Sequence, residues 1–390
     1  MTTDGKGLRN SNGMVLMSSL MILSVLLAVG IGIRVMLLND YRVLANLRGG
    51  TEAFYYSAAG VEWSKNELAR DTAFPPAPVS QAKAFASGSF SVSFSPPAIV
   101  DPLTARVVVR SVGTIDNSSQ VLQAQLSRGY DLADGALALR GNAARINLVT
   151  GATLISGVDH DPLNGNLLPE AKSRSAATFS DDALKDLFLQ ALGNPPPAGV
   201  LESATDVPAI APSGYLPASV VTQVANDLCA APGVLLHPVP AGGNVIFENQ
   251  LWGSQLSPQL HCVEGGVGAG DAASFTGNVS GVGILVVKDA DMVLTGTFRW
   301  EGWVIVTGGE VGFKASGTTS KEVLGAVLIN ETGSPGSSTA ILDIQGNLRL
   351  LFSRAALRRS AQLIPNATLN NTYAALPTFV LQDYWRAINP

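Results

Sequence analysis

An uncharged apolar run near the N-terminus is the feature that most constrains this sequence. From Met14 to Ile33 the chain reads MVLMSSLMILSVLLAVGIGI, without one charged residue. A helix needs about 20 such residues to cross the hydrocarbon core of a bilayer. No second run of this kind follows in the sequence. We therefore predict one transmembrane helix over residues 14–33, with the rest of the chain on one side of the membrane.

Three interpretations of this run are open. A cleaved secretory signal fits the basic residues Lys6 and Arg9, although the run is longer than the usual apolar core of about 7 to 15 residues. A plain signal anchor is the second interpretation, and its orientation is undecided because basic residues lie on both sides of the run. The third starts from a short basic leader that ends in Gly13, directly before Met14.

A helical pattern continues far beyond the apolar run. Apolar or small side chains recur at three- and four-residue spacing, which is typical of one helix face: Leu44, Leu47, Thr51, Phe54, Ala58, Val61 and Leu68. The pattern predicts one helix over residues 14–70, about 84 Å long from Met14 to Ala69 at about 1.5 Å per residue. We expect Gly49 and Gly50 to weaken or bend it. An ordinary membrane-proximal stalk or coiled coil is the alternative.

The N-terminal region resembles a known family. The leader ending in Gly13, the apolar helix and the segment RVLANLRGGTEAFYYSAAGVEWSKNEL are similar to the N-terminal region of pilin-like assembly proteins of the PilX type, from type IV pili. In that family a prepilin peptidase cuts after the glycine and the new N-terminus is methylated. The resemblance therefore makes residues 1–13 a leader and places the processing site between Gly13 and Met14.

The resemblance also implies a location, partners and a contact surface. It implies insertion in the inner membrane, a periplasmic body that passes to the pilus or cell surface, and contacts with other pilin-like subunits and the pilus assembly machinery. The apolar stripe would pack the helices together, through Leu44, Leu47, Phe54, Ala58 and Val61. Major pilins carry Glu at the fifth mature position, which is Ser18 here, and minor PilX-like members commonly lack it too. The family's Glu before an Ala-Gly pair is Ala58 here.

The rest of the chain is typical of short strands. The segments SGSFSVSFS, ARVVVRSVG and QVLQAQLSR alternate apolar and polar residues, which predicts a β-meander over residues 85–130 that covers the stripe of the helix. Short strands recur in residues 135–175 and 262–355, where Ile284, Val304 and Ala326 stand at corresponding places. This spacing predicts a β-helix or solenoid-like body, with an antiparallel sandwich as the alternative.

Two helical segments interrupt these strands. SDDALKDLFLQALG begins with Ser180 as a candidate N-cap, and LPASVVTQVANDLCAA follows. They make residues 175–260 an α-rich insertion and leave residues 356–390 as a C-terminal tail. The predicted fold class is mainly β, with a long N-terminal transmembrane pilin-like helix, a β-meander and a solenoid-like C-terminal region.

Two small groups of residues invite a chemical interpretation. Cys229 and Cys262 are the two cysteines of the chain and belong to the part outside the cytoplasm, so we predict a disulfide between them, with two separate buried thiols as the alternative. Asp159, Asp161 and Asn164 precede Gly165 with the loose spacing of a calcium loop, without its distal Glu. Asp and Asn are also favoured in tight turns, which is the alternative here.

Composition argues against catalysis and against nucleic acid. Three His and two Cys leave few residues for a metal or nucleophilic site, and the net charge of -5 comes without a basic block. No GxSxG, HExxH or GxxxxGK[ST] motif occurs. We expect a minor pilin or pilin-like assembly subunit, without enzymatic activity and without a cofactor other than the calcium just considered. The alternatives are an adhesin or glycan-binding β-helix protein, and a polysaccharide-cleaving β-helix enzyme that uses carboxylates at Asp289, Asp291, Glu301 and Glu310.

Overall fold

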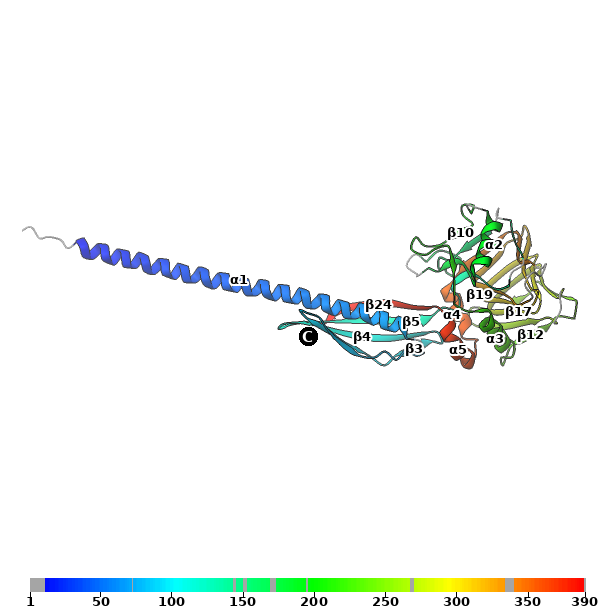
Figure 1. Cartoon of the computed structure of the whole chain (residues 1–390), viewed down its shortest axis with the longest axis horizontal. Helices are drawn as coiled ribbons and strands as arrows, with labels where there is room; N and C mark the ends of the chain where they lie inside the picture. The colour runs from blue at the N-terminus through cyan, green and yellow to red at the C-terminus, as the bar shows by residue number, and fades with distance from the viewer. Residues whose placement is uncertain are drawn as a thin grey trace, which may run out of the picture.

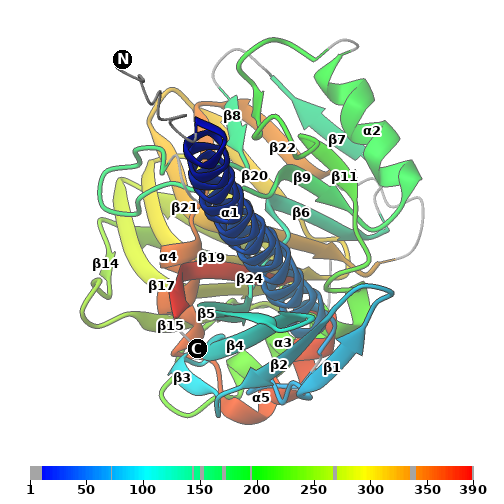
Figure 2. The same cartoon turned by 90° about the vertical axis from the view of Figure 1, so that its left-hand side faces the viewer.

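A computed structural model describes residues 11–71, 73–142, 145–149, 153–168, 173–193, 196–266, 270–333 and 340–388, with the side chains of the first helix from Leu16 onward. Three parts follow one another along the long axis: a projecting helix, a sheet packed on the second half of that helix, and a larger β body (Figure 1). Seen from the N-terminal side, the strands of the sheet lie beside the far end of the helix, and the body lies behind them (Figure 2).

The first helix, α1, runs from Ser11 to Arg70 without interruption. Its 60 residues extend about 90 Å at about 1.5 Å per residue. The helix continues without a break through Gly49 and Gly50, the two residues that we expect to weaken or bend it. Residues 1–10 of the predicted leader lie outside the described residues, and the helix already begins within its last three residues.

An antiparallel sheet, called the head sheet here, packs on α1. Its strand order is β1-β2-β4-β5-β24, with β3 beside β4. The predicted meander corresponds to β2, β4 and β5. The strand bounds are β1 Gln81–Ala84, β2 Ser89–Phe94, β3 Ala98–Asp101, β4 Thr104–Ile115, β5 Ser118–Tyr130 and β24 Thr378–Ile388.

The C-terminal residues are not a tail. They form α4 (Arg354–Ala361), α5 (Asn366–Thr372), a short 3-10 turn at Tyr373–Ala375, and then β24. β24 pairs with β5 from Thr378 opposite Tyr130 to Ile388 opposite Val121. Residues 131–377, called the body here, are thus inserted between two neighbouring strands of the head sheet. The backbone N–H of Asp131 donates to the carbonyl of Pro377 at 2.9 Å, so the chain enters and leaves the body side by side.

The body contains two parallel sheets. The twelve-stranded sheet has the order β10-β8-β23-β21-β19-β17-β15-β12, with β14 beside β17, β6 beside β21 and β9, and β11 beside β9; the six-stranded sheet has the order β13-β16-β18-β20-β22-β7. The bounds are β6 Gly135–Gly141, β7 Arg145–Leu148, β8 Thr153–Ser156, β9 Ser175–Phe179, β10 Leu201–Glu202, β11 Ile210–Pro212, β12 Leu235–Pro238, β13 Asn244–Glu248, β14 Leu251–Trp252, β15 Gln259–Glu264, β16 Ala272–Thr276, β17 Asn278–Lys288, β18 Asp291–Leu294, β19 Thr297–Gly308, β20 Phe313–Gly317, β21 Lys321–Glu331, β22 Ala340–Gly346 and β23 Leu348–Phe352.

Successive strands from β15 to β23 alternate between these two sheets, and each pairs in parallel with the next strand of its own sheet. The antiparallel sandwich is therefore wrong for the described residues. Ile284 stands opposite Trp303, and Trp303 stands opposite Ala326. The predicted correspondence of Val304 with these positions is off by one residue, because Val304 pairs with Leu285 and Val327 instead. The buried side chains of both sheets form the main hydrophobic core.

The region 175–260 contains the two predicted helices, α2 (Asp182–Leu192) and α3 (Ala218–Cys229). Asp181 rather than Ser180 caps α2, since its carboxylate accepts the backbone N–H of Leu184. The same region also supplies β9 to β14, which pair within the two parallel sheets. It is therefore part of the β body and not a separate α-rich insertion.

Candidate functional site

The N-terminal half of α1 projects from the rest of the molecule. Side chains from Leu16 to Arg48 are all exposed, and the most apolar window of this helix has a mean hydropathy of 2.5 with none of it buried. Among the described residues, α1 is the one helix long and apolar enough to cross a membrane. Leu44 and Leu47, two of the predicted packing positions, are each 63% exposed. An exposed apolar surface of this kind is typical of a site that contacts lipid or another protein.

The second half of α1 packs on the head sheet through a face of small side chains. The buried residues of this face are Ala53, Ser57, Gly60, Ser64 and, at its end, Leu68. The hydroxyls of Ser57 and Ser64 donate to helix carbonyls at 2.8 and 2.7 Å, so they are paired although buried. A Cβ added to Gly60 would lie 2.1 Å from the Ser111 hydroxyl of β4. The small side chains therefore allow the helix and the sheet to approach closely.

The predicted apolar stripe lies on a neighbouring face of α1. Successive helix residues are about 100° apart around the axis, so Phe54 and Ala58 flank the small-residue face and are only partly buried, whereas Val61 is buried. The expectation that the head sheet covers the stripe is thus wrong for Leu44 and Leu47 and only partly right for Phe54 and Ala58. The small residues Ala53, Ser57, Gly60 and Ser64 recur at the same spacing in the sequence and are the signal that was missed.

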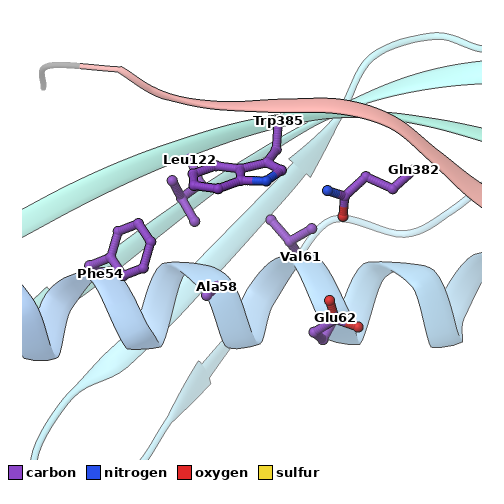
Figure 3. A pocket seen from close by; sticks show the side chains of 7 residues that line it. All are labelled: Phe54, Ala58, Val61, Glu62, Leu122, Gln382 and Trp385. Carbon is purple, nitrogen blue, oxygen red and sulfur yellow. The ribbon is translucent and has the colours of Figure 1, made fainter.

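Beside the sheet, the stripe borders a groove between α1 and the C-terminal strand β24 (Figure 3). Its cavity measures about 110 Å³, and its lining residues are Phe54, Ala58, Val61, Glu62, Leu122, Gln382 and Trp385. The Trp385 ring lies 6.2 Å from the Phe54 ring, centroid to centroid, and 53% of Trp385 is exposed. The groove therefore has apolar walls and remains open to solvent. Trp385 belongs to β24, in the residues that were expected to form a C-terminal tail.

One carboxylate stands at the rim of this groove. The Glu62 side chain is 66% exposed and accepts from the Lys65 ammonium at 2.6 Å, one helical turn away. Exposed pairs of this kind stabilise a helix only slightly, so Glu62 can accept a further donor from outside the molecule. The groove thus offers apolar contact area and one anionic position.

The predicted processing site lies at the start of α1. The backbone of Gly13 and Met14 is helical. Their side chains and residues 1–10 lie outside the described part of the molecule. Cleavage between these two residues therefore stays a prediction, which N-terminal mass determination tests.

The predicted calcium loop is a network of bonds within the protein. The carboxylate of Asp159 accepts from the backbone N–H of Arg354 at 2.9 Å and from its guanidinium at 3.3 Å. Asp161 accepts from the Leu163 N–H at 3.0 Å, and Asn164 accepts from the Asn166 N–H at 2.8 Å. Within the described ranges, no three His, Cys, Asp or Glu side chains are grouped to hold a metal ion. These bonds favour the turn interpretation, and calcium binding stays a prediction that calorimetry tests.

The two cysteines are joined in a disulfide. Cys229 ends α3 and Cys262 lies within β15, and their Cα atoms are 5.4 Å apart. The bond therefore fastens a surface helix to the larger parallel sheet.

Two of the four carboxylates considered for polysaccharide cleavage accept hydrogen bonds within the body. Asp291 accepts from the Lys314 ammonium and the Gly312 N–H, and Glu301 accepts from the Gln255 amide at 2.8 Å. Asp289 and Glu310 have positive φ angles of 54° and 61°. The side chains of Trp300 and Trp303 are buried, 0% and 1% exposed. Stacking of a sugar on either indole is thus not available.

A buried charge network lies where the chain enters and leaves the body. Asp131, directly after β5, accepts from the guanidinium of Arg354 at 2.8 Å and from that of Arg174 at 2.5 Å. Arg354 also contacts Asp159 at 3.3 Å. Burial by itself raises the pKa of the Asp131 carboxyl, but the charges of Arg354 and Arg174 outweigh this and hold its pKa below the ordinary value. Arg174 also donates to the carbonyl of Thr378, the first residue of β24, at 3.4 Å, so the network contacts the head sheet at this point.

Comparison with known proteins gives similarity to solved structures. No protein-family model matches this chain, and no curated protein matches it. A solved structure, the crystal structure of the competence-associated pilin ComZ from Thermus thermophilus, is similar over 87% of this chain and 97% of that chain, at 12% identity and a TM-score of 0.25. A TM-score this low carries no argument about function. The projecting apolar helix and the head sheet packed on its second half carry the argument instead.

Proposed function

We propose that this protein is a pilin-like subunit, of the minor kind, that takes part in the assembly of a type IV pilus or pseudopilus. One observation carries the proposal: a single helix is exposed from Leu16 to Arg48, is uncharged and apolar up to Ile33, and packs on an antiparallel sheet through its continuation. Such a helix suits a subunit that is first held by lipid and then by other helices. The inner membrane is accordingly the proposed starting location, with the body in the periplasm and later on the pilus or cell surface.

Helix packing supplies the driving force in this proposal. When subunits leave the bilayer, contacts between apolar helices replace contacts with lipid, and close van der Waals packing decides which arrangement is favoured. The proposed partners are therefore other pilin-like subunits and the pilus assembly machinery. A prepilin peptidase that cuts between Gly13 and Met14, followed by methylation of Met14, would prepare the chain for assembly.

We infer further that the body is a β-solenoid carried for display. The alternation of strands between two parallel sheets and the continuous core between them support this inference. The body lies at the end of the molecule remote from the projecting helix (Figure 1), which suits recognition of a surface and favours an adhesin as the second candidate function. Loss of glycan or cell binding by pili that lack this subunit would support the adhesin. In either case the proposed work is assembly or display, not catalysis.

Two measurements test the assembly proposal. Mass spectrometry of the N-terminus in membrane and sheared-surface fractions is expected to find methylated Met14; an intact leader would leave a simple anchored protein, and a start near Ile31 would make it a secreted one. Leu23→Arg, in the middle of the span, should abolish membrane retention and incorporation into fibres, because a charge at the bilayer centre is strongly unfavourable. Leu251→Arg is the control, since Leu251 is 78% exposed on the body. Normal incorporation of the Leu23→Arg chain would contradict the proposal.

A further inference from the structure

No described segment of the molecule fills the groove between α1 and β24, which continues an exposed apolar stripe. Leu44 and Leu47 lie on the projecting half, and the same helix face runs on to Phe54 and Ala58 at the groove. The head sheet covers the neighbouring small-residue face instead. We propose that the groove receives the projecting helix of a second copy of this chain, in one defined register. This inference rests on the proposed function and adds to it the contact partner and the offset between copies.

Charge selects the register. Glu62 is the one charged residue lining the groove, and Arg34 is the first charged residue after the uncharged run. Setting Arg34 of one copy beside Glu62 of the next corresponds to an axial offset of about 42 Å, at about 1.5 Å per residue. This offset places Leu26 opposite Phe54 and Gly30 opposite Ala58. The apolar Leu26 then faces the aromatic side chain of Phe54, and the positive charge of Arg34 faces the negative charge of Glu62.

The other two cations of the projecting half, Arg42 and Arg48, do not fit in this way. Pairing Arg42 with Glu62 would bring Arg34 opposite Phe54, and pairing Arg48 with Glu62 would bring Asp40 there. Each of these registers sets a charged side chain against the apolar wall of the groove, which is unfavourable. Arg34 is thus the cation among these three that pairs with Glu62 and leaves the wall apolar.

Side-chain size supports the same register. Gly30 lies on the helix face formed by Leu23, Leu26, Leu27, Gly30, Ile31 and Arg34. A Cβ added to Gly30 would meet nothing within 4 Å in one copy, so this position is open. Opposite Ala58 it would let two helix backbones approach closely, as small residues do at helix interfaces in membranes.

Disulfide crosslinking of the full chain tests the register. The described residues include no free cysteine, so two introduced cysteines report on their own proximity. Gly30→Cys combined with Ala58→Cys should give a ladder of crosslinked copies in sheared fibres after mild oxidation, because copies that share one bilayer lie at the same depth and lack the axial offset. The matched control is Gly32→Cys with Ala58→Cys, because Gly32 is also open to solvent but lies about 200° around the helix from Gly30. The control should give severalfold less crosslinking.

The second test exchanges the charges at positions 34 and 62 in the chain that carries the Gly30→Cys and Ala58→Cys pair. Arg34→Glu should lower crosslinking by about two- to fivefold, as for a partly exposed ion pair, and adding Glu62→Arg should restore it. Equal ladders from the 30/58 and 32/58 pairs, or no rescue by the exchanged pair, would overturn the register. A chain that is processed at Met14 and present in fibres but forms no ladder would overturn the inference and leave the proposed function standing. An unprocessed chain that is absent from fibres and forms no ladder would overturn both.

Discussion

The backbone of Gly113 in β4 lies directly against that of Ala53 in α1. A Cβ added to Gly113 would stand 2.1 Å from the Ala53 carbonyl oxygen and 2.4 Å from the Ser57 nitrogen. Helix and sheet therefore meet backbone to backbone, and any side chain at position 113 must push them apart. Since this contact holds the helix on the head sheet, it also sets where the groove beside it opens.

Gly113→Ala should therefore destabilise the head. Overpacking of a close contact costs about 1 to 3 kcal/mol, and occasionally more when backbone atoms must move. We expect a lower unfolding temperature for the full chain in detergent, followed by circular dichroism. Gly214→Ala is the matched control, because a Cβ there meets nothing within 4 Å. Equal unfolding temperatures for the two variants would show that the contact is not tight.

Asp131→Asn should loosen the junction where the chain enters and leaves the body. Asp131 is buried between the guanidiniums of Arg354 and Arg174, and removing its charge leaves two cations without their shared carboxylate. Breaking a buried pair in this way costs about 3 to 5 kcal/mol. The expected readout is faster proteolysis at the junction between residues 131 and 377. Asp182→Asn, which removes the exposed partner of Lys185, should leave the cleavage rate unchanged, and the same rate in both variants would contradict the structural role of Asp131.

The body should lose stability as pH falls from about 6.5 to about 4. Burial, followed by the nearby His237, lowers the pKa of His261 to about 4, and its ring stacks on Trp252 at 4.2 Å between centroids. In this window the unfolded chain binds a proton that the folded chain does not, so stability falls by at most about 1.4 kcal/mol per pH unit. The unfolding temperature of His261→Phe should depend less steeply on pH. An unchanged slope would assign the acid sensitivity to other groups.

Much of this architecture follows from residue patterns, and the predictions that were wrong have physical causes. The run from Met14 to Ile33 and the spacing beyond it predict α1 because helix periodicity is local. β24 was not predicted, because a residue pattern does not show which distant segment a strand pairs with. Its partner β5 lies far away in the chain. The stripe of large residues was preferred to the face of Ala53, Ser57 and Gly60 because hydrophobicity favours large side chains. At this interface, closeness of approach decides the packing instead.

The buried charge network could not be predicted from residue patterns either. Asp131 and Arg354 are separated by most of the body and look like ordinary surface charges in the sequence. Both are buried, 2% and 6% exposed, because the fold brings the start and the end of the body together. The burial of a charged residue can be predicted only when its partner is known. The groove could not be predicted for the same reason, because it forms only where the fold sets Trp385 of β24 beside Phe54 of α1.

Replacing both cysteines, Cys229→Ala with Cys262→Ala, should destabilise the body without changing its fold. The disulfide closes a loop with a sequence separation of 33 residues, and in the chain-entropy description such a crosslink contributes roughly 4 kcal/mol by restricting the unfolded chain. Both Cys229 and Cys262 are buried, at 8% and 0% exposed, and alanine leaves only small gaps. The double variant should unfold at lower temperature, and reduction of the unaltered protein should bring it to a similar value. If reduction and the double substitution both left the unfolding temperature unchanged, the disulfide would not contribute to stability. A lower unfolding temperature in the double variant alone would identify the lost side-chain packing as the cause.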